Sequence, residues 1–177
     1  MNRLITSLVA IAMSGGGLSV ADVAVAHAES SAAADSVVTI SRQNSRNQVL
    51  TEDSYSRGAV ITTNTGDPSQ RWTLRQSQYG SVEIMGGATG KCLKLETDRE
   101  REGRGLPGKV LRGKCGANGE SWQRWYLGDN GDGTVTIRSA LYITSHQCLD
   151  GSGGAALTMK CDGSQGQKWQ VTTNSSQ

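Results

Sequence analysis

The sequence contains one tripeptide pattern three times, a glutamine and a tryptophan separated by a single basic residue. The three copies are Gln70-Arg71-Trp72, Gln123-Arg124-Trp125 and Gln167-Lys168-Trp169. They recur at intervals of roughly 50 residues, a spacing at which each copy marks one supersecondary unit of a repeat architecture. This threefold repetition constrains the fold more than any other feature of the chain.

Further markers accompany the tripeptide in the same order in every unit. Alternating, strand-like segments open the units at residues 37–40, 81–84 and 134–137. Hydrophobic pairs follow at Val49-Leu50, Cys92-Leu93 and Cys148-Leu149, and again at Val60-Ile61, Val110-Leu111 and Ala156-Leu157. We therefore expect an all-β domain with about four short strands per unit. Three units closed around a pseudo-threefold axis would bury the apolar faces and remove sheet edges.

The tripeptide has a physical explanation in a strand, where residues two apart share a face. Gln and Trp therefore project together. We expect the indole to fill the core between units, and the glutamine amide to satisfy backbone groups that would otherwise be buried without partners.

Four cysteines lie after the N-terminal segment, and four cysteines allow three pairings. In the second and third units they occupy matching places, at the Cys-Leu pair and after the strand that precedes the tripeptide. The first unit has Val49 and Asn64 at these places, so both cysteines are missing together. This pattern predicts two disulfides within units, Cys92–Cys115 and Cys148–Cys161. The alternative of a zinc site lacks Cys-x-x-Cys spacing and has one histidine, His146, after the N-terminal segment.

The N-terminal segment resembles a secretory signal peptide. A basic Met1-Asn2-Arg3 start, a short apolar run over residues 4–13 and a small-x-small Ala26-His27-Ala28 site predict cleavage near Ala28. The apolar run is too short for a membrane span. We expect residues 1–28 to be a signal peptide, 29–36 a disordered segment, 37–173 the folded domain and 174–177 a flexible tail. The mature protein would be secreted, with no membrane insertion.

Charge and chemistry exclude several classes of function. The formal net charge is +2, so nothing in the charge balance points to nucleic acid or an anionic membrane surface. His146 stands alone, and no serine lies in a Gly-x-Ser-x-Gly frame. We expect no enzyme activity, no metal and no cofactor.

Three in-phase Gln-x-Trp units with Cys-Leu-Asp-type openings resemble the ricin-B (R-type) lectin family, from about Val37 to Thr172. The resemblance implies a β-trefoil that binds glycans or glycoproteins through one shallow pocket per unit, without catalysis. The family's pocket carboxylate is the Asp of Cys-Leu-Asp, which matches Asp150 in the third unit. Thr51 and Lys94 stand there in the first and second units, although Glu52 or Asp53 could substitute in the first.

The other pocket positions of the family are also altered. The family asparagine is matched by Asn118 in the second unit, Asp162 in the third and Thr65 in the first, and the family aromatic is replaced by Val60, Leu111 and Leu157. The third unit keeps the best set, with Asp150, Asp162 and Gln167. Tyr55, Trp122 and Tyr142 are candidate replacement stacking platforms. The plainer alternatives are that Asp150 caps a turn and that Trp122 packs in the interior.

A charged, glycine-rich loop over residues 97–108 separates Cys92 from Cys115. Its ordinary interpretation is a solvated surface loop. Trefoil inhibitors of serine proteases present an arginine or lysine on such a loop, and Arg101 or Arg104 could serve that purpose. Two functions therefore stay open: a secreted carbohydrate-binding protein with degenerate sugar pockets, and a sugar-blind trefoil that binds proteins, such as a protease inhibitor or a toxin-associated subunit.

Overall fold

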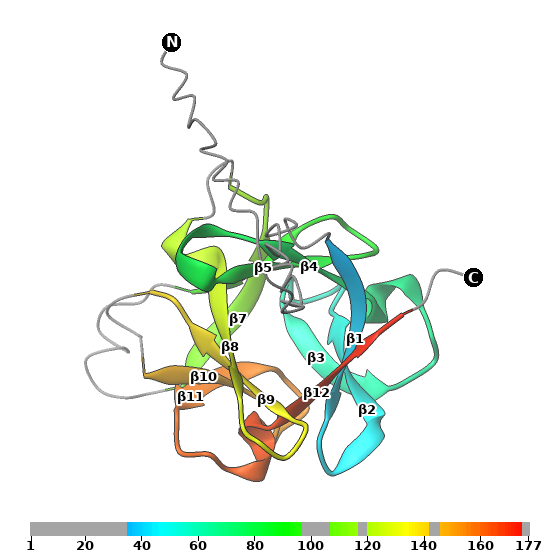
Figure 1. The fold of residues 1–177 in the computed structure, drawn as a ribbon. Coiled ribbons are helices and arrows are strands. Elements are labelled where there is room, and N and C mark those ends of the chain that lie inside the picture. The colour runs from blue at the N-terminus through cyan, green and yellow to red at the C-terminus, as the bar shows by residue number, and fades with distance from the viewer. Residues whose placement is uncertain (1–34, 97–106, 117–119, 142–145, 175–177) are drawn as a thin grey trace, which may run out of the picture. The chain divides into compact units, whose positions relative to one another are not determined.

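The computed structural model describes residues 35–96, 107–116, 120–141 and 146–174. Twelve strands fall into three groups of four, in chain order (Figure 1). The first repeat has β1 (Ser36–Arg42), β2 (Ser45–Glu52), β3 (Ala59–Thr63) and β4 (Trp72–Gln76). The second has β5 (Val82–Gly86), β6 (Cys92–Leu95), β7 (Gly108–Gly113) and β8 (Arg124–Asp129). The third has β9 (Val135–Ser139), β10 (Gln147–Asp150), β11 (Leu157–Lys160) and β12 (Trp169–Thr173).

The first and last strands of each repeat form a closed antiparallel ring, in the order β1-β4-β5-β8-β9-β12. The ring closes where β12 pairs with β1, with Val38 opposite Thr173 and Arg42 opposite Trp169. A closed ring leaves no unpaired edge for another chain to extend.

The two middle strands of each repeat form hairpins, β2–β3, β6–β7 and β10–β11. The hairpins also touch one another. Leu157 of β11 pairs with Lys109 of β7, Gly58 pairs with Leu111, and Val60 pairs with Ala155. A six-strand ring joined to three mutually contacting hairpins is the β-trefoil arrangement, so the predicted fold is confirmed.

Three tryptophans fill the core, and each repeats the same contact. Trp72, Trp125 and Trp169 have no exposed surface. Their indole N–H groups donate to the backbone carbonyl oxygens of the leucine in the hydrophobic pair of the same repeat, at Leu50 (2.9 Å), Leu93 (3.2 Å) and Leu149 (3.0 Å). The indole therefore contributes apolar area without leaving its one polar group unpaired.

The glutamines repeat a second contact. The Gln70 amide donates to the carbonyl of Thr63 at 2.8 Å and accepts from the N–H of Thr65 at 2.8 Å. The same pattern recurs for Gln123 with Lys114 and Gly116, and for Gln167 with Lys160 and Asp162. Each glutamine therefore fixes the loop that leaves the third strand of its repeat, as the sequence predicted. A short 3₁₀ turn ends at each of these glutamines, at Pro68–Gln70, Ser121–Gln123 and Gln165–Gln167.

Both disulfides form as predicted, Cys92–Cys115 and Cys148–Cys161, with Cα atoms 5.0 Å apart in each. Strand β1 begins at Ser36, and the N–H of Asn174 donates to the carbonyl of Val37 at 2.8 Å. The predicted signal peptide lies outside the described residues. Within the described part of the chain, no helix has the length and apolar character to cross a membrane.

The register of the hairpins corrects the alignment of one sequence marker. Leu50 pairs with Ile61, whereas Leu93 pairs with Arg112 and Leu149 with Thr158. Ile61 is therefore equivalent to Arg112 and Thr158, and the sequence marker Val60-Ile61 was misaligned by one residue relative to the markers of the other two units. The buried position of Ile61 holds an arginine in the second repeat, and the exposed fraction of the Arg112 side chain is only 5%.

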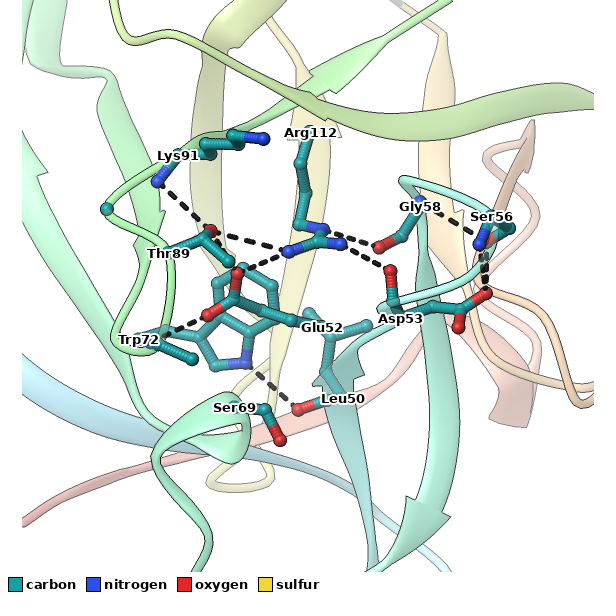
Figure 2. A network of polar contacts seen from close by, with 12 residues as sticks. Leu50, Glu52, Asp53, Ser56, Gly58, Ser69, Trp72, Thr89, Lys91 and Arg112 are labelled. Atoms are coloured by element: carbon teal, nitrogen blue, oxygen red, sulfur yellow. Dashed lines mark hydrogen bonds and ion pairs between the residues drawn. The ribbon is translucent and has the colours of Figure 1, made fainter.

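Arg112 reaches across to the first repeat and pairs with Glu52 (Figure 2). Their closest atoms, Nη1 and Oε2, are 2.5 Å apart, and the Glu52 side chain is 2% exposed. The guanidinium also donates to the carbonyls of Gly58 and Asp53, and the carboxylate accepts from the N–H of Ala88 and the hydroxyl of Thr89. A buried ion pair is tolerated when its remaining hydrogen-bonding groups are satisfied in this way.

Candidate functional site

One position in each repeat directly follows the core leucine of the second strand. Thr51, Lys94 and Asp150 occupy it, and each pairs with a residue of the neighbouring strand: Val60, Leu111 and Leu157 respectively. The register therefore confirms that these three residues are equivalent. It also rules out a register slip in the first repeat. Glu52 forms an ion pair with Arg112, and the carboxylate of Asp53 accepts a hydrogen bond from the N–H of Ser56.

Asp53 caps the turn after β2. Its carboxylate accepts hydrogen bonds from the N–H groups of Tyr55 and Ser56, each at 3.0 Å. The side-chain hydrogen bond from Ser56 is the main cause that lowers the pKa of Asp53. Neither Glu52 nor Asp53 therefore substitutes for the missing carboxylate of the first repeat.

The first repeat presents hydroxyl groups at the equivalent position. The hydroxyls of Thr51 and Thr62 are 2.6 Å apart, and the amide of Gln70 donates to Thr62 at 3.1 Å. Thr51 is 8% exposed. This small polar cluster is internally satisfied and offers little to a ligand.

In the third repeat, Asp150 ends β10, whereas Asp162 and Gln167 lie between β11 and β12, where the Asp162 N–H donates to the Gln167 side-chain oxygen at 3.0 Å. Asp150 is 7% exposed and accepts from the N–H and hydroxyl of Ser152 at 2.8 and 2.5 Å. Asp162 accepts from the N–H of Ser164 at 2.9 Å, and this hydrogen bond is the main cause that lowers its pKa. Both carboxylates therefore cap turns of their own.

The second repeat is hollowed at the equivalent position. A cleft of about 470 Å³ is lined by Lys94, Gly113, Lys114, Gly116, Glu120, Trp122 and Gln123, among others. A second hollow of about 330 Å³, lined by Leu95, Glu96 and Leu111, shares Lys94 and Trp122 with the first. The Trp122 side chain lies in the wall of both hollows, and the residue keeps 38% of its surface exposed.

Two glycines explain why this cleft is open. A Cβ atom on Gly113 would lie 3.2 Å from the Lys94 side chain, and one on Gly116 would lie 2.8 Å from that of Glu120. Side chains at these places would therefore crowd the walls. The N–H of Gly116 also donates a hydrogen bond to the side-chain oxygen of Gln123. Thr65 and Asp162 make the same hydrogen bond in the first and third repeats.

The remaining predicted site residues are not gathered at the cleft. Tyr55 is 97% exposed, in the turn capped by Asp53, and it lines none of the described clefts. Asn118, Tyr142, Arg101 and Arg104 lie outside the described residues. Of the three predicted stacking platforms, Trp122 is the one that the structure places beside a cleft.

The fold and the altered pockets define a trefoil of the lectin class. The family model of the ricin-type beta-trefoil lectin domain matches residues 80–177, more than half of the chain. The chain belongs to this family, whose domains typically bind carbohydrate without catalysing a reaction. A search of curated proteins found no match. Across the described residues, no three His, Cys, Asp or Glu side chains come together as a metal site would require.

Solved structures share the fold at low sequence identity. The designed threefold-symmetric protein ThreeFoil is 19% identical with a TM-score of 0.64, over 77% of this chain and 97% of that one. SeviL, bound to asialo-GM1 saccharide, is 16% identical with a TM-score of 0.58, over 77% and 96%. The exo-beta-1,3-galactanase 1,3Gal43A from Clostridium thermocellum is 23% identical with a TM-score of 0.63, over 78% of this chain and 30% of that one.

Proposed function

We propose that this chain is a secreted carbohydrate-binding protein whose working pocket is the cleft of the second repeat. The observation that carries the proposal is an exposed tryptophan beside a lysine at the family's carboxylate position. Trp122 offers an aromatic face for the C–H surface of a sugar ring. Lys94 replaces a hydrogen-bond acceptor by a donor, so it would bind hydroxyl oxygens through their lone pairs.

Export is supported by the signal-like N-terminal segment together with two disulfides. Disulfides persist in oxidising compartments and are rare in the cytosol. The two bonds here close loops within the second and third repeats, as structural disulfides of a small extracellular domain do.

The third repeat is the weaker candidate for the pocket. Asp150 is nearly buried, and its Oδ1 atom already accepts from both polar groups of Ser152. Leu157 stands where the family has an aromatic residue, so a sugar would have no ring to stack on. The side chain of Gln167 is also unavailable, because backbone groups occupy both its oxygen and its nitrogen.

We expect weak binding to single sugars and useful affinity only for multivalent glycans. A shallow pocket buries little of its ligand, and avidity gains affinity without new contacts only when several sites engage together. Millimolar or tighter binding of free galactose or mannose would contradict this expectation.

A glycan array with the full, disulfide-bonded chain tests the proposal. Trp122→Ala should lose the binding that the unaltered chain shows, whereas Asp150→Ala should retain it. Tyr55→Ala is the matched control, since it removes an exposed aromatic ring that lines none of the described clefts. Binding that depends on Asp150 and not on Trp122 would transfer the site to the third repeat.

If the unaltered chain bound no glycan on the array, the result would contradict carbohydrate binding itself. It would leave the alternative that this trefoil binds proteins through the loop of Arg101 and Arg104. That loop lies outside the described residues, so the alternative stays a prediction from the sequence. Failure to inhibit trypsin-like or subtilisin-like enzymes at micromolar concentration would remove its protease-inhibitor form.

A further inference from the structure

The three junctions between successive repeats are built alike but filled differently. They are the strand pairs β4–β5, β8–β9 and β12–β1. At the first, Arg75 forms an ion pair with Glu83. At the second, the Arg138 guanidinium lies 5.2 Å from the centre of the Tyr126 ring. Long side chains therefore cover the outer face of both junctions.

At the third junction, β1 has short side chains at both of these places. Ser41 is opposite Gln170 there, and Thr39 is opposite Thr172. Because Ile40, Ile84 and Ile137 are equivalent core residues, Ser41 corresponds to Met85 and Arg138. The outer face of this junction is consequently hollow, with a cleft of about 530 Å³. This volume lies in the range of small-molecule sites.

Polar groups dominate the lining of this cleft, notably those of Thr39, Ser41, Arg46, Asn64, Gln170 and Asn174. Asn174 accepts a hydrogen bond from the Thr39 hydroxyl at 3.2 Å. Its Nδ2 group is buried and has no hydrogen-bond partner among the described residues. Hydroxyl and amide groups at this density suit a ligand with several hydroxyls.

Arg46 supplies the one charge in this lining. Its Nε group donates to the side-chain oxygen of Gln170 at 3.0 Å, which fixes the plane of the guanidinium. No carboxylate in the described part of the chain forms an ion pair with it. An oriented, unpaired guanidinium is suited to bind a carboxylate through two parallel hydrogen bonds.

We propose that the cleft between β1 and β12 is a second binding site, selective for a sugar acid. The carboxylate of the ligand would pair with Arg46, and its hydroxyls would meet Thr39, Ser41 and Asn174. This site lies at a repeat junction, separate from the three pocket positions of the family. It does not depend on the second-repeat cleft.

Titration of the full, disulfide-bonded chain, followed by amide NMR shifts, tests the site. Sodium glucuronate should shift residues of β1 and β12 saturably, and glucose and sodium acetate should bind more weakly. Arg46→Gln should weaken glucuronate binding by about tenfold or more, since charge-assisted hydrogen bonds are the strong ones. Arg138→Gln is the matched control, because it removes the same charge at another junction, from the position that Ser41 occupies here.

A second variant tests the cavity rather than the charge. Ser41→Met introduces into this cleft the side chain that the first junction has at the equivalent position, Met85. We therefore expect the chain to fold and, because the cleft is filled, to lose glucuronate binding. Trp122→Ala should bind glucuronate unchanged, which separates this site from the proposed pocket. A glucuronate-terminated oligosaccharide shows the source of the ligand: tighter binding than the free acid indicates a glycan end, and equal binding indicates the monosaccharide.

The proposal is overturned if glucuronate gives no saturable shifts, or if Arg46→Gln binds it as well as the unaltered chain does. Equal affinity for acetate would reduce the cleft to a general anion site. Equal affinity for glucose would remove the role of Arg46.

Discussion

The Gln-x-Trp corners and the positions that follow the core leucines lie close together in each repeat, yet they behave differently. At the corners, the same two side chains make the same backbone contacts three times. At the positions after the leucines, Thr51, Lys94 and Asp150 share a register and have no common partner. The residues that complete the core therefore keep the same side chains and contacts in all three repeats, whereas the neighbouring surface positions differ between repeats.

The middle residue of the tripeptide shows the same division within a single motif. Its backbone carbonyl accepts an N–H from the strand end of a neighbouring repeat in all three cases. Its basic side chain differs: Arg71 donates to the carbonyl of Gly66, Arg124 lies 5.6 Å from the Tyr79 ring, and Lys168 pairs with Asp132. Function can change at the outward side chain while the backbone contact is kept.

The largest effect should come from breaking a corner. Trp125→Ala removes a fully buried indole and should lower the free energy of unfolding by about 3 to 5 kcal/mol. The nearby Trp122→Ala should lower it by only about 1 kcal/mol, because that side chain is partly exposed. Urea unfolding of both variants checks the contrast. Equal losses would mean that Trp122 belongs to the core.

The next effect comes from the ion pair of Glu52 and Arg112, whose positions hold Leu95 in the second repeat and Ile61 in the first. Arg112→Ile leaves Glu52 buried without its partner and should cost about 3 kcal/mol. The double variant Glu52→Leu with Arg112→Ile restores the residue types found at Leu95 and Ile61. It should recover most of the loss in the same unfolding experiment. A double variant as unstable as the single one would show that the pair contributes net stability.

A smaller effect should distinguish the repeat that lacks a disulfide. Gln70 holds the loop between Thr63 and Thr65 without the help of a disulfide. In the second repeat, Cys115 lies between the two residues that Gln123 holds, and it is bonded to Cys92. Gln70→Ala should therefore cost about 2 kcal/mol, and Gln123→Ala about 1 kcal/mol. Thermal unfolding under oxidising conditions measures the difference. Reduction of the disulfides should bring the two costs closer together.

The smallest effect concerns Asp132 and the middle residue of the third tripeptide. The hydrogen bond from Lys168, together with that from Thr134, lowers the pKa of Asp132 well below its usual value. A lowered pKa in the folded state adds stability above the unfolded pKa and loses it as the pH falls through the folded pKa. Asp132→Asn should therefore reduce the loss of stability on acidification below about pH 4, the ordinary aspartate range. An unchanged acid profile would contradict the pairing.

The fold was predictable because it rests on chemistry that the sequence repeats. The tripeptide, the hydrophobic pairs and the paired loss of two cysteines each appear in phase, so strands, corners and disulfides could be placed from the residues. The register of β3 could not, because a five-residue strand with adjacent apolar residues fits two alignments. Its misplacement by one residue concealed Arg112, whose partner Glu52 lies 60 positions away.

The candidate site was predictable only in part. The repeat pattern placed Asp150, Asp162 and Gln167 together, and the structure links two of them directly, because the Asp162 N–H donates to the Gln167 side-chain oxygen. The open cleft of the second repeat depends on the absence of side chains at Gly113 and Gly116 and on the outward position of Trp122. A sequence pattern shows which residues recur and at what spacing, but it does not show whether their side chains leave an open cleft in the folded structure.

Closure of the ring by β1 and β12 also has a consequence for the order in which the chain can fold. A contact such as that between Thr39 and Asn174 joins residues 135 positions apart, and such non-local contacts slow folding because loop closure must precede them. During synthesis the first repeat must wait for the last strand, with β1 still lacking one neighbour. Until Thr173 has been synthesised, the ring stays open, and incomplete chains of this kind expose strand edges on which they can aggregate.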